Sequence, residues 1–512
     1  MKFIMLMMVL HAMVTVSAES MLNNGNFERE IAPWELSDEK IGALSLVTGK
    51  SNFIHSGIGA LKLEAGEKGT VRIVCRDNYG YINTSPGQRW KFKAWAKGNG
   101  VLKFGVYEYG EPTHTLGLDS LGSTWSPGFN LSENWQCFEY QYIGQRVHLS
   151  LLLAAFEVSG SSAVAYIDDV EFLKDSTPGW KMNLLPRNLV SYPGGTLELG
   201  TSLLYNQNPA PGETVTVNGS DLGSCGGICE PQTSGDGKIN WQFKLPANQP
   251  TGVRQLSVIC SKAGIGETVY ADIIPEAQYR ELEEQASTIR NPGTVLVIGD
   301  SISDFLRGYN YIDTLAYFTA KRFPGQSVWR NYGIGGDMAP RCIDRLNGKK
   351  VHAFKRYAGI FDVKPNLVII SLGHNDSLVL DKTMGINSPL QVPPEKFKEN
   401  MLELIKIVRQ KCNNPEIVLL TPVLADYEKS MKHCAKVKYV FGEPSVVAKY
   451  RDLVKEIGQI AGCSVIDVFT PTANHPNRNA LYNFDGVHLT SSGNKVIAME
   501  ILKYLNSKAQ KQ

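Results

Sequence analysis

The run Thr294-Val-Leu-Val-Ile-Gly-Asp-Ser-Ile-Ser303 decides how the C-terminal part of this chain folds. Its first half is an uninterrupted apolar segment, which is typical of a parallel strand buried on both faces of a sheet. Gly299 permits a tight turn after this strand, and residues 305–309 are expected to lie on the helix that follows. We therefore expect Ser301 at a strand-to-helix turn, where free helix N–H groups and the helix dipole favour negative charge.

The same alternation of buried strands and amphipathic helices continues towards the C-terminus. Apolar runs at 367–370 and 417–420 alternate with helical patterns at 397–408 and 446–457. This alternation predicts a doubly wound α/β domain with a parallel, flavodoxin-like sheet over residues 293–512. Ligands bind such sheets at the carboxyl ends of the strands, so the residues placed there are the candidates for chemistry.

Three further polar segments fall at strand ends or directly before the last helix. They are Asn331–Asp337 with three glycines, Ser371–Asp376, and the short run from Asp485 to His488. The Asp485 carboxylate can reach Nδ1 of His488 within one loop, which would fix the tautomer and leave Nε2 to activate a hydroxyl. Taken alone, Ser301 fits a helix cap as well as a nucleophile, but the whole set favours the nucleophile.

Taken together and in this order, the four segments resemble the Ser, Gly, Asn and His blocks of the SGNH (GDSL-type) hydrolases. The resemblance covers about residues 294–505. It implies that Ser301 is the nucleophile, that His488 is the general base, and that Asp485 orients the imidazole. The implied reaction is acyl transfer through a covalent acyl-enzyme, for which no metal or organic cofactor is required.

The resemblance also assigns the donors that stabilise an oxyanion. They are the backbone N–H groups of Ser301 and Gly336 and the side-chain amide of Asn375. Gly336 is preferred because an aspartate follows it, as in the Gly-Asp pattern of the family, and Gly335 is the alternative. His374 precedes the block asparagine, and Gly-His-Asn-Asp resembles the polysaccharide acetylesterase branch that includes rhamnogalacturonan acetylesterases. His374 is therefore a candidate substrate contact, with a structural role as the alternative.

Residues 1–18 have the pattern of an export signal. Lys2 provides a positive start, an apolar stretch follows, and Val16-Ser17-Ala18 presents small residues for cleavage near Ala18. The apolar stretch is shorter than the ~20 residues that a membrane-spanning helix needs. We therefore expect a secreted or periplasmic protein without a membrane span, and a retained N-terminal helix or anchor is the alternative.

Short alternating apolar runs predict an all-β domain over residues 19–175, with the strand spacing of a jelly roll. Segments at 23–28, 55–63 and 166–170 resemble the jelly-roll carbohydrate-binding modules attached to xylanases and related enzymes. That resemblance implies a structural calcium ion, for which Glu28 and Asp168 are the candidate ligands. Candidate sugar-stacking aromatics are Tyr79, Tyr81, Trp125 and Trp135, although for any single one of them core packing is the favoured explanation.

Between these two parts, residues 176–275 predict a small immunoglobulin-like β-sandwich that serves as a spacer. A charged, Pro-bounded segment at 276–292 predicts a linker helix. Nine cysteines leave at least one thiol unpaired, and for the Cys225–Cys229 spacing a small-loop disulfide or free thiols are favoured over metal. The polar insertion Asp426–Pro444 is expected to border the active site.

Composition narrows the class of protein. A chain of 512 residues is too long for a single hydrophobic core, so several domains are expected. The net charge of +2 provides no electrostatic reason to expect a nucleic-acid partner. The leading interpretation is an exported carbohydrate esterase that removes acetyl groups from polysaccharide or another acylated glycan. The alternatives are a lipid or general carboxylesterase of the same fold and, in another class, an inactive carbohydrate-binding protein. The ester, the oligomeric state and the disulfide pairing stay open.

Overall fold

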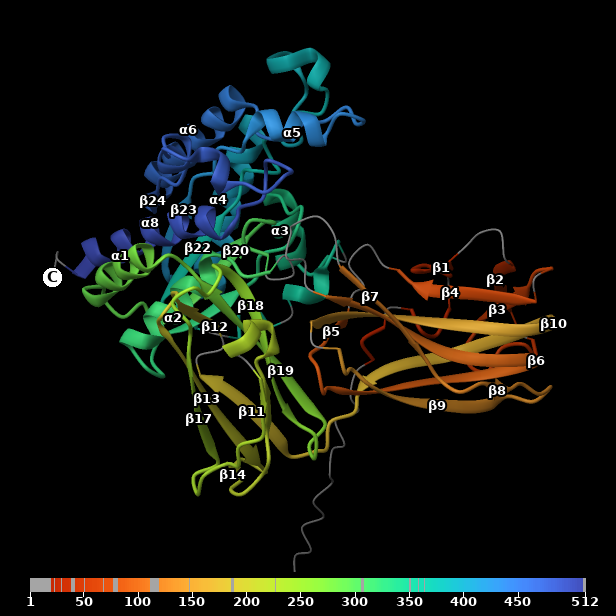
Figure 1. Cartoon of the computed structure of the whole chain (residues 1–512). Helices are drawn as coiled ribbons and strands as arrows, with labels where there is room; N and C mark the ends of the chain where they lie inside the picture. The colour runs from red at the N-terminus through yellow and green to blue at the C-terminus, as the bar shows by residue number, and fades with distance from the viewer. Residues whose placement is uncertain are drawn as a thin grey trace, which may run out of the picture.

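The chain folds into two β-rich regions followed by an α/β domain (Figure 1). The computed structural model describes residues 20–509, apart from 23, 29, 38–41, 50, 68, 77–81, 111–118, 147, 186–187, 226, 305–307, 350, 358 and 363. The predicted export signal at 1–18 lies outside these residues. Within the described part of the chain, no helix combines the length and the apolar character that crossing a membrane requires.

The N-terminal region is one hydrogen-bonded, antiparallel sheet of ten strands. Two very long strands, β6 (Arg89–Gly110) and β10 (Leu149–Lys174), pair with each other, and the other strands attach to one of them directly or through a neighbour. A core rich in phenylalanine and tryptophan fills its interior. The remaining strands are β1 (Trp34–Leu36), β2 (Gly42–Thr48), β3 (Gly59–Ala65), β4 (Thr70–Cys75), β5 (Ile82–Asn83), β7 (Asp119–Trp125), β8 (Phe129–Asn130) and β9 (Gln136–Ile143).

The middle region consists of two sheets that share one hydrophobic core. One sheet has the order β11-β13-β14 with β17 on β13, and the other has the order β12-β19-β18-β15-β16. The eight cysteines whose side chains are described, Cys229 among them, are free thiols. The elements are β11 (Trp180–Leu185), β12 (Asn188–Ser191), β13 (Thr196–Tyr205), β14 (Asn208–Pro209), β15 (Thr216–Asn218), η1 (Ser220–Cys225), β16 (Ile228–Cys229), β17 (Lys238–Lys244), β18 (Gly252–Cys260) and β19 (Ile265–Ile273).

The C-terminal domain is built on a five-stranded parallel sheet with the order β21-β20-β22-β23-β24. Its strands are β20 (Thr294–Gly299), β21 (Val328–Asn331), β22 (Leu367–Ser371), β23 (Glu416–Leu420) and β24 (Ser464–Ile466). Its helices are α1 (Glu276–Ser287), α2 (Tyr311–Arg322), α3 (Ala339–Leu346), η3 (Phe354–Tyr357), η4 (Lys382–Asn387), α4 (Pro394–Lys411), α5 (Tyr427–His433), α6 (Pro444–Ala461), α7 (Phe469–Ala473), η5 (Arg478–Leu481) and α8 (Ser491–Ala509). Strand β21 lies on one side of β20, and β22, β23 and β24 follow on the other side, so the order of the strands reverses between β20 and β22. Sheets of this kind bind ligands at that point.

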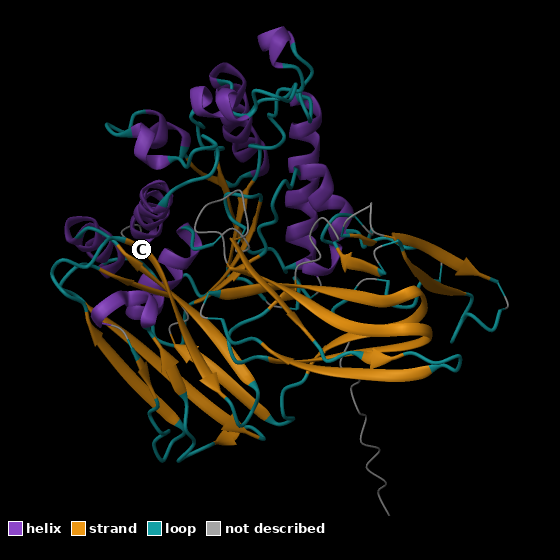
Figure 2. Ribbon diagram, turned by 45° about the vertical axis from the view of Figure 1, so that its right-hand side comes forward, coloured by secondary structure: helices purple, strands orange, loops and turns teal. Residues whose placement is uncertain are grey.

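Helices cover both faces of this sheet, as the uninterrupted apolar strands predict (Figure 2). Val295 and Val297 of β20 pack in one core with residues of α1, α2 and α8. Leu296 and Ile298 of the same strand pack in a second core with residues of α3, α4 and α6. Alternate side chains of a strand point to opposite faces, so one short apolar strand serves both layers.

The middle region is packed firmly against the α/β domain. Val190 and Ile274 of the middle region belong to the core that lies under α1, α2 and α8. Asp272 of β19 accepts hydrogen bonds from Lys495 Nζ at 2.5 Å and from Ser491 Oγ at 2.8 Å, both on α8. The Asp272 and Lys495 side chains are fully enclosed. A buried ion pair that loses one partner typically costs 3–5 kcal/mol, so this contact ties the two parts into one unit.

Candidate active site

Ser301 lies in a tight turn directly after β20. Ile302 N–H donates to Asp300 Oδ1 at 2.9 Å, and Ser303 N–H donates to the Asp300 carbonyl at 3.1 Å. Ser301 itself is 7% exposed. The turn is therefore held by the residue before the serine, which keeps Ser301 at the carboxyl edge of the sheet.

The helix expected directly after Ser301 is tested only at Tyr309, which lies outside any helix, because residues 305–307 are not described. The first described helix after it, α2, begins at Tyr311. Asn310 caps this helix through a capping box with Asp313, which fixes the helix start at that point. Residues 305 and 306, which were expected on the helix, lie outside the described part of the chain.

Asp485 and His488 form a buried, directly bonded pair. His488 Nδ1 lies 2.5 Å from Asp485 Oδ2, and the two residues are 8% and 1% exposed. Val487 N–H and His488 N–H both donate to Asp485 Oδ1, at 3.0 and 3.1 Å. Burial alone would raise the pKa of Asp485, but the hydrogen bond and charge of His488 outweigh it and hold the pKa below its usual range. The carboxylate is therefore ionised and occupies Nδ1, so Nε2 is the ring atom suited to accept a proton from a hydroxyl.

Gly335 and Gly336, in the glycine segment after β21, differ in their hydrogen bonding and in their backbone conformation. Gly335 N–H donates to Asp304 Oδ2 at 2.6 Å, so this amide is already committed. Gly336 has a φ of 73°, a left-handed conformation that favours glycine. Of the two, Gly336 is therefore the better candidate for an oxyanion donor, in agreement with the choice made from the Gly-Asp pattern.

Asn375 is joined to the same glycine segment. Its side-chain Nδ2 donates to the Asp337 carbonyl at 3.0 Å, and the residue is 8% exposed. A side-chain amide has two N–H donors, so this bond orients the group while using one of them. The structure thus brings the Gly336 and Asn375 segments into direct contact, as a shared oxyanion site requires.

Two arginines that sequence reasoning missed hold these loops. Arg345 of α3 forms a fully buried ion pair with Asp337 at 2.7 Å. Arg356 Nη2 donates to Asp304 Oδ1 at 2.9 Å and to the Gly333 carbonyl at 2.6 Å. Asp304 thereby links Arg356 to the amide of Gly335. No local pattern marks Arg356, because its partners are distant in the sequence.

His374 is enclosed beside the Asp485–His488 pair. It is 3% exposed, and its ring stacks on Phe441 with centroids 5.8 Å apart and planes 4° apart. Burial, together with the neighbouring charge of His488, lowers the pKa of His374 to about 4. The imidazole is therefore neutral at neutral pH. Its role as a substrate contact stays a prediction.

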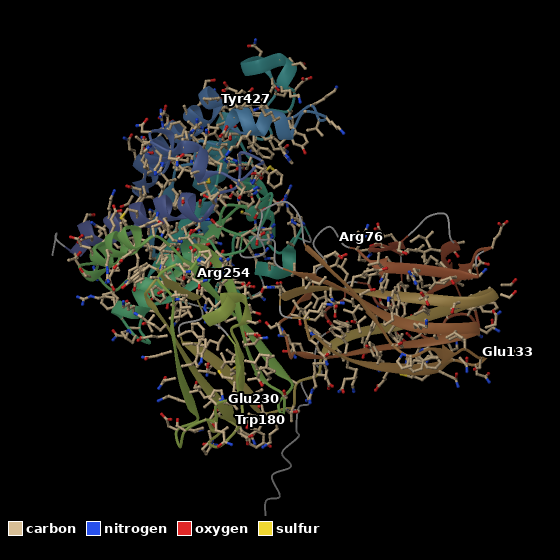
Figure 3. All side chains as sticks on the ribbon, viewed as in Figure 1. Arg76, Glu133, Trp180, Glu230, Arg254 and Tyr427 are labelled. Carbon is tan, nitrogen blue, oxygen red and sulfur yellow. The ribbon has the colours of Figure 1, made fainter. Side chains whose placement is uncertain are left out.

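The insertion Asp426–Pro444 packs on the loop that carries Asp485 and His488. Asp426 N–H donates to the Gly486 carbonyl at 2.7 Å, and Lys429 Nζ donates to the Tyr482 carbonyl at 3.1 Å. A Cβ on Gly486 would lie 2.3 Å from the Asp426 carbonyl oxygen, so only glycine permits this approach. Helix α5 of the insertion begins at Tyr427, which is labelled near the top of Figure 3.

The depressed pKa of His374 predicts a pH effect on stability. Its pKa lies at about 4 in the folded chain and at 6.5 ordinarily, so between these values the unfolded chain binds the proton and unfolding becomes easier. Burial raises the pKa of Asp376 to about 7, which acts in the opposite sense, so wild type and variant must be compared. As pH falls from 6.5 to 4, the free energy of unfolding of wild type should therefore decrease by about 3 kcal/mol relative to that of His374→Gln.

Urea unfolding at a series of pH values measures this difference. His433→Gln, at an exposed histidine, is measured alongside as a control for the substitution itself. Parallel curves for His374→Gln and wild type would show that His374 is not held neutral by burial.

The two predicted calcium ligands are engaged with backbone amides. Glu28 Oε2 accepts from Ile58 N–H at 2.9 Å, and Asp168 Oδ2 accepts from His55 N–H and Ser56 N–H at 3.0 and 3.1 Å. Among the described residues there is no group of three or more His, Cys, Asp or Glu side chains that could hold a metal ion. The calcium ion stays a prediction.

The candidate sugar-stacking aromatics are only partly described. Tyr79 and Tyr81 lie outside the described residues. Trp125 is half-buried, and its ring lies so close over Gly105 that a Cβ there would be 2.4 Å away. Trp135 is also half-buried and donates from Nε1 to the Asn52 carbonyl at 3.2 Å. Sugar binding by these side chains therefore also stays a prediction.

The fold and the site together define the family of the C-terminal domain. Residues 297–496 match the GDSL-like Lipase/Acylhydrolase family. The match begins within β20, before Ser301, and ends within α8, after His488, so it contains all four polar segments. The domain belongs to the GDSL/SGNH hydrolases, whose members act on ester bonds, and the resemblance inferred from the sequence is confirmed.

Individual relatives match only part of the chain. A GDSL esterase/lipase of Arabidopsis thaliana is 25% identical over 145 residues, which cover 28% of this chain and 58% of the relative. The isoamyl acetate-hydrolyzing esterase 1 homolog of Mus musculus is 25% identical over 150 residues, which cover 28% of this chain and 57% of the relative. The chain thus spans little more than half the length of these relatives. A solved lipase/acylhydrolase from Enterococcus faecalis is 19% identical with a TM-score of 0.32, covering 42% of this chain and 96% of that one.

Proposed function

We propose that the chain is an exported serine esterase that removes acetyl groups from polysaccharide. The observation that supports the esterase activity most directly is the buried Asp485–His488 pair, bonded at 2.5 Å, in the domain that places Ser301 after β20. An ionised carboxylate behind an imidazole is the arrangement that activates a serine hydroxyl. Export rests on the pattern of residues 1–18 alone.

In the proposed reaction, Ser301 Oγ attacks the ester carbonyl carbon while His488 Nε2 takes the hydroxyl proton. Asp485 stabilises the imidazolium that forms. The negative oxygen of the tetrahedral intermediate accepts hydrogen bonds from the N–H groups of Ser301 and Gly336 and from the Asn375 amide. The intermediate collapses, His488 returns the proton to the departing alcohol, and the acyl group stays on Ser301. Water then attacks the acyl-enzyme while His488 takes its proton, and His488 returns this proton to Ser301 Oγ as the carboxylic acid leaves.

The polysaccharide as substrate is supported by the N-terminal half of the chain. Its ten antiparallel strands agree with a jelly roll, and the two sheets of the middle region agree with an immunoglobulin-like sandwich. We assign the first to carbohydrate binding with a structural calcium ion at Glu28 and Asp168. Both assignments rest on resemblance of sequence and arrangement of strands.

A second candidate substrate is the acetate ester of a small alcohol. The mouse relative is named an isoamyl acetate-hydrolyzing esterase homolog, and the match with it covers 28% of this chain. Both candidates share acetate as the acyl group and differ in the alcohol. The size of the alcohol therefore separates them.

A panel assay of acetate release tests the proposal. Wild type and Ser301→Ala are compared on acetylated xylan, acetylated pectin, acetylated sialoglycans, isoamyl acetate and a long-chain p-nitrophenyl ester. Acetate release from a glycan by wild type alone is the expected result. Cleavage of isoamyl acetate without any glycan would favour the small alcohol, and cleavage of only the long-chain ester would contradict the acetyl assignment.

A further inference from the structure

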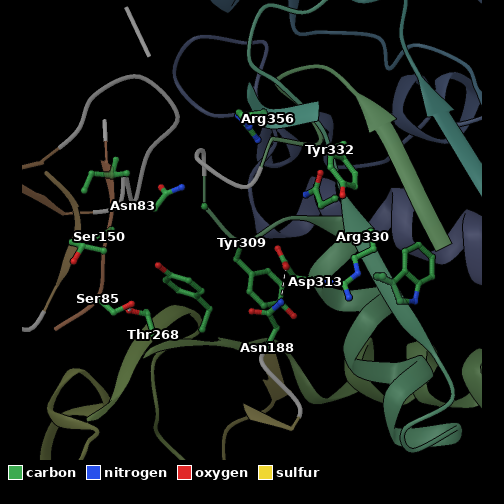
Figure 4. A pocket seen from close by; sticks show the side chains of 16 residues that line it. Asn83, Ser85, Ser150, Asn188, Thr268, Tyr309, Asp313, Arg330, Tyr332 and Arg356 are labelled. Carbon is green, nitrogen blue, oxygen red and sulfur yellow. Dashed lines mark hydrogen bonds between the residues drawn. The ribbon is translucent and has the colours of Figure 1, made fainter. Parts of the chain in front are cut away.

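A cavity of about 590 Å³ lies where the three folded parts of the chain meet (Figure 4). The N-terminal region contributes Asn83, Ser85 and Ser150, and the middle region contributes Asn188 and Thr268. The α/β domain supplies the rest of the wall, from the segment before α2, from β21 with the residue after it, and from η3. The cavity lies within the 300–1,000 Å³ range of small-ligand sites.

Hydrogen bonds across the domain boundaries hold the walls in place. Thr268 Oγ1 of the middle region donates to Ser85 Oγ of the N-terminal region at 3.1 Å. Asn188 Nδ2 of the middle region donates to Asp313 Oδ1 of α2 at 2.7 Å. The cavity is thus formed by three domains that are already bonded to one another, and a ligand would not need to assemble it.

The cavity wall on the α/β side is also the support of the catalytic loops. Asn331 Nδ2 donates to the Ser303 carbonyl at 2.6 Å, two residues after the candidate nucleophile. Arg356, another lining residue, donates a hydrogen bond to the Asp304 carboxylate. The same carboxylate accepts a hydrogen bond from the backbone N–H of Gly335, which precedes the candidate oxyanion donor Gly336. A molecule in the cavity would therefore touch the residues that support both loops.

The lining chemistry suits hydroxyl-rich ligands. Hydroxyl and amide side chains from all three parts line the space, and three tyrosines, Tyr270, Tyr309 and Tyr332, are also among the lining residues. Such combinations bind pyranose rings by hydrogen bonds along their edges and by stacking on their faces. Arg330 is exposed at the cavity and forms no ion pair with any residue that the structure describes, so its guanidinium can bond two hydroxyls or a carboxylate.

We propose that this cavity is a glycan subsite, which binds a pyranose segment of the polymer whose ester is presented to Ser301. The inference rests on the proposed polysaccharide substrate and adds that all three domains bind the chain. Neutral and uronic-acid pyranoses share this chemistry, and xylan and pectin distinguish them.

Two variants test the subsite by kinetics. Asn83→Trp places a large ring into the cavity, and Arg330→Ala removes the guanidinium that lines it. Each should lower kcat/KM on acetylated xylan or acetylated pectin by about fivefold to tenfold more than on p-nitrophenyl acetate. The matched controls Asn130→Trp and Arg322→Ala, both exposed and away from the lining residues, should leave this ratio unchanged. An unchanged ratio for Asn83→Trp and Arg330→Ala on polymers that wild type cleaves would overturn the subsite.

Direct binding separates failure of the subsite from failure of the proposed function. Calorimetric titration of xylohexaose and hexagalacturonate into Ser301→Ala, and into Ser301→Ala combined with Asn83→Trp, requires no turnover. Loss of binding in the double variant supports the subsite, even if no acetylated polymer is cleaved. Absence of binding to Ser301→Ala, or equal binding to both proteins, overturns it, even if polymer is deacetylated.

Discussion

Ser301→Ala is expected to lower kcat for ester hydrolysis by on the order of 10⁴–10⁶-fold while the protein stays folded. In the proposed mechanism, alanine removes the Oγ atom that forms the acyl-enzyme, and the oxyanion donors alone provide little turnover. The residue is 7% exposed in a turn held by Asp300, so loss of one hydroxyl leaves the turn intact. The measurement is steady-state hydrolysis of p-nitrophenyl acetate, with circular dichroism as a check of folding.

The neighbouring Ser303 offers a matched control. Its Oγ lies 2.8 Å from Tyr311 Oη in the core, so Ser303→Ala should affect stability more than kcat. Full activity in Ser301→Ala, or equal loss in both variants, would contradict the role of Ser301 as nucleophile.

Asp485→Asn is expected to lower kcat by about 10⁴-fold with little change in fold. An amide in place of the carboxylate cannot stabilise the imidazolium, and it favours the tautomer with the proton on the wrong nitrogen. The change also alters stability against pH. Because the pKa of Asp485 is lowered from 3.8, the carboxylate stabilises the folded chain above that pH and loses this effect as pH falls through the folded pKa.

The test is kcat against pH together with acid unfolding of wild type and Asp485→Asn. The exposed Asp452, bonded to Arg451, provides a matched carboxylate outside the site, and Asp452→Asn should retain wild-type kcat. If Asp485→Asn retained kcat within tenfold of wild type, the catalytic pair would be assigned incorrectly.

Periodicity was sufficient to predict the architecture of the α/β domain. The helical spacing at 397–408 corresponds to α4, and that at 446–457 corresponds to α6. Both helices bury one face, and a helix of this kind has apolar residues at helical spacing in its own sequence. The pairing of Asp485 with His488 could also be predicted, because both residues lie in one loop.

Other parts of the site depend on contacts that local sequence does not record. Tyr309 was expected on a helix after Ser301, but it precedes α2, which begins at Tyr311 because the Asn310 capping box fixes its start. Arg356 reaches Asp304 from a distant segment of the chain. The packing of Asp272 against Lys495 joins two domains, and no periodicity within either domain predicts it.

Covalent trapping tests the central claim most directly. A fluorophosphonate reacts with an activated serine by forming a P–O bond to Oγ and releasing fluoride, which leaves a stable adduct. Wild-type protein is labelled, digested and analysed by mass spectrometry. The predicted result is one adduct on Ser301, absent from Ser301→Ala and slowed in Asp485→Asn. An adduct on another serine that persists in Ser301→Ala, or no adduct in an active preparation, would contradict the assignment.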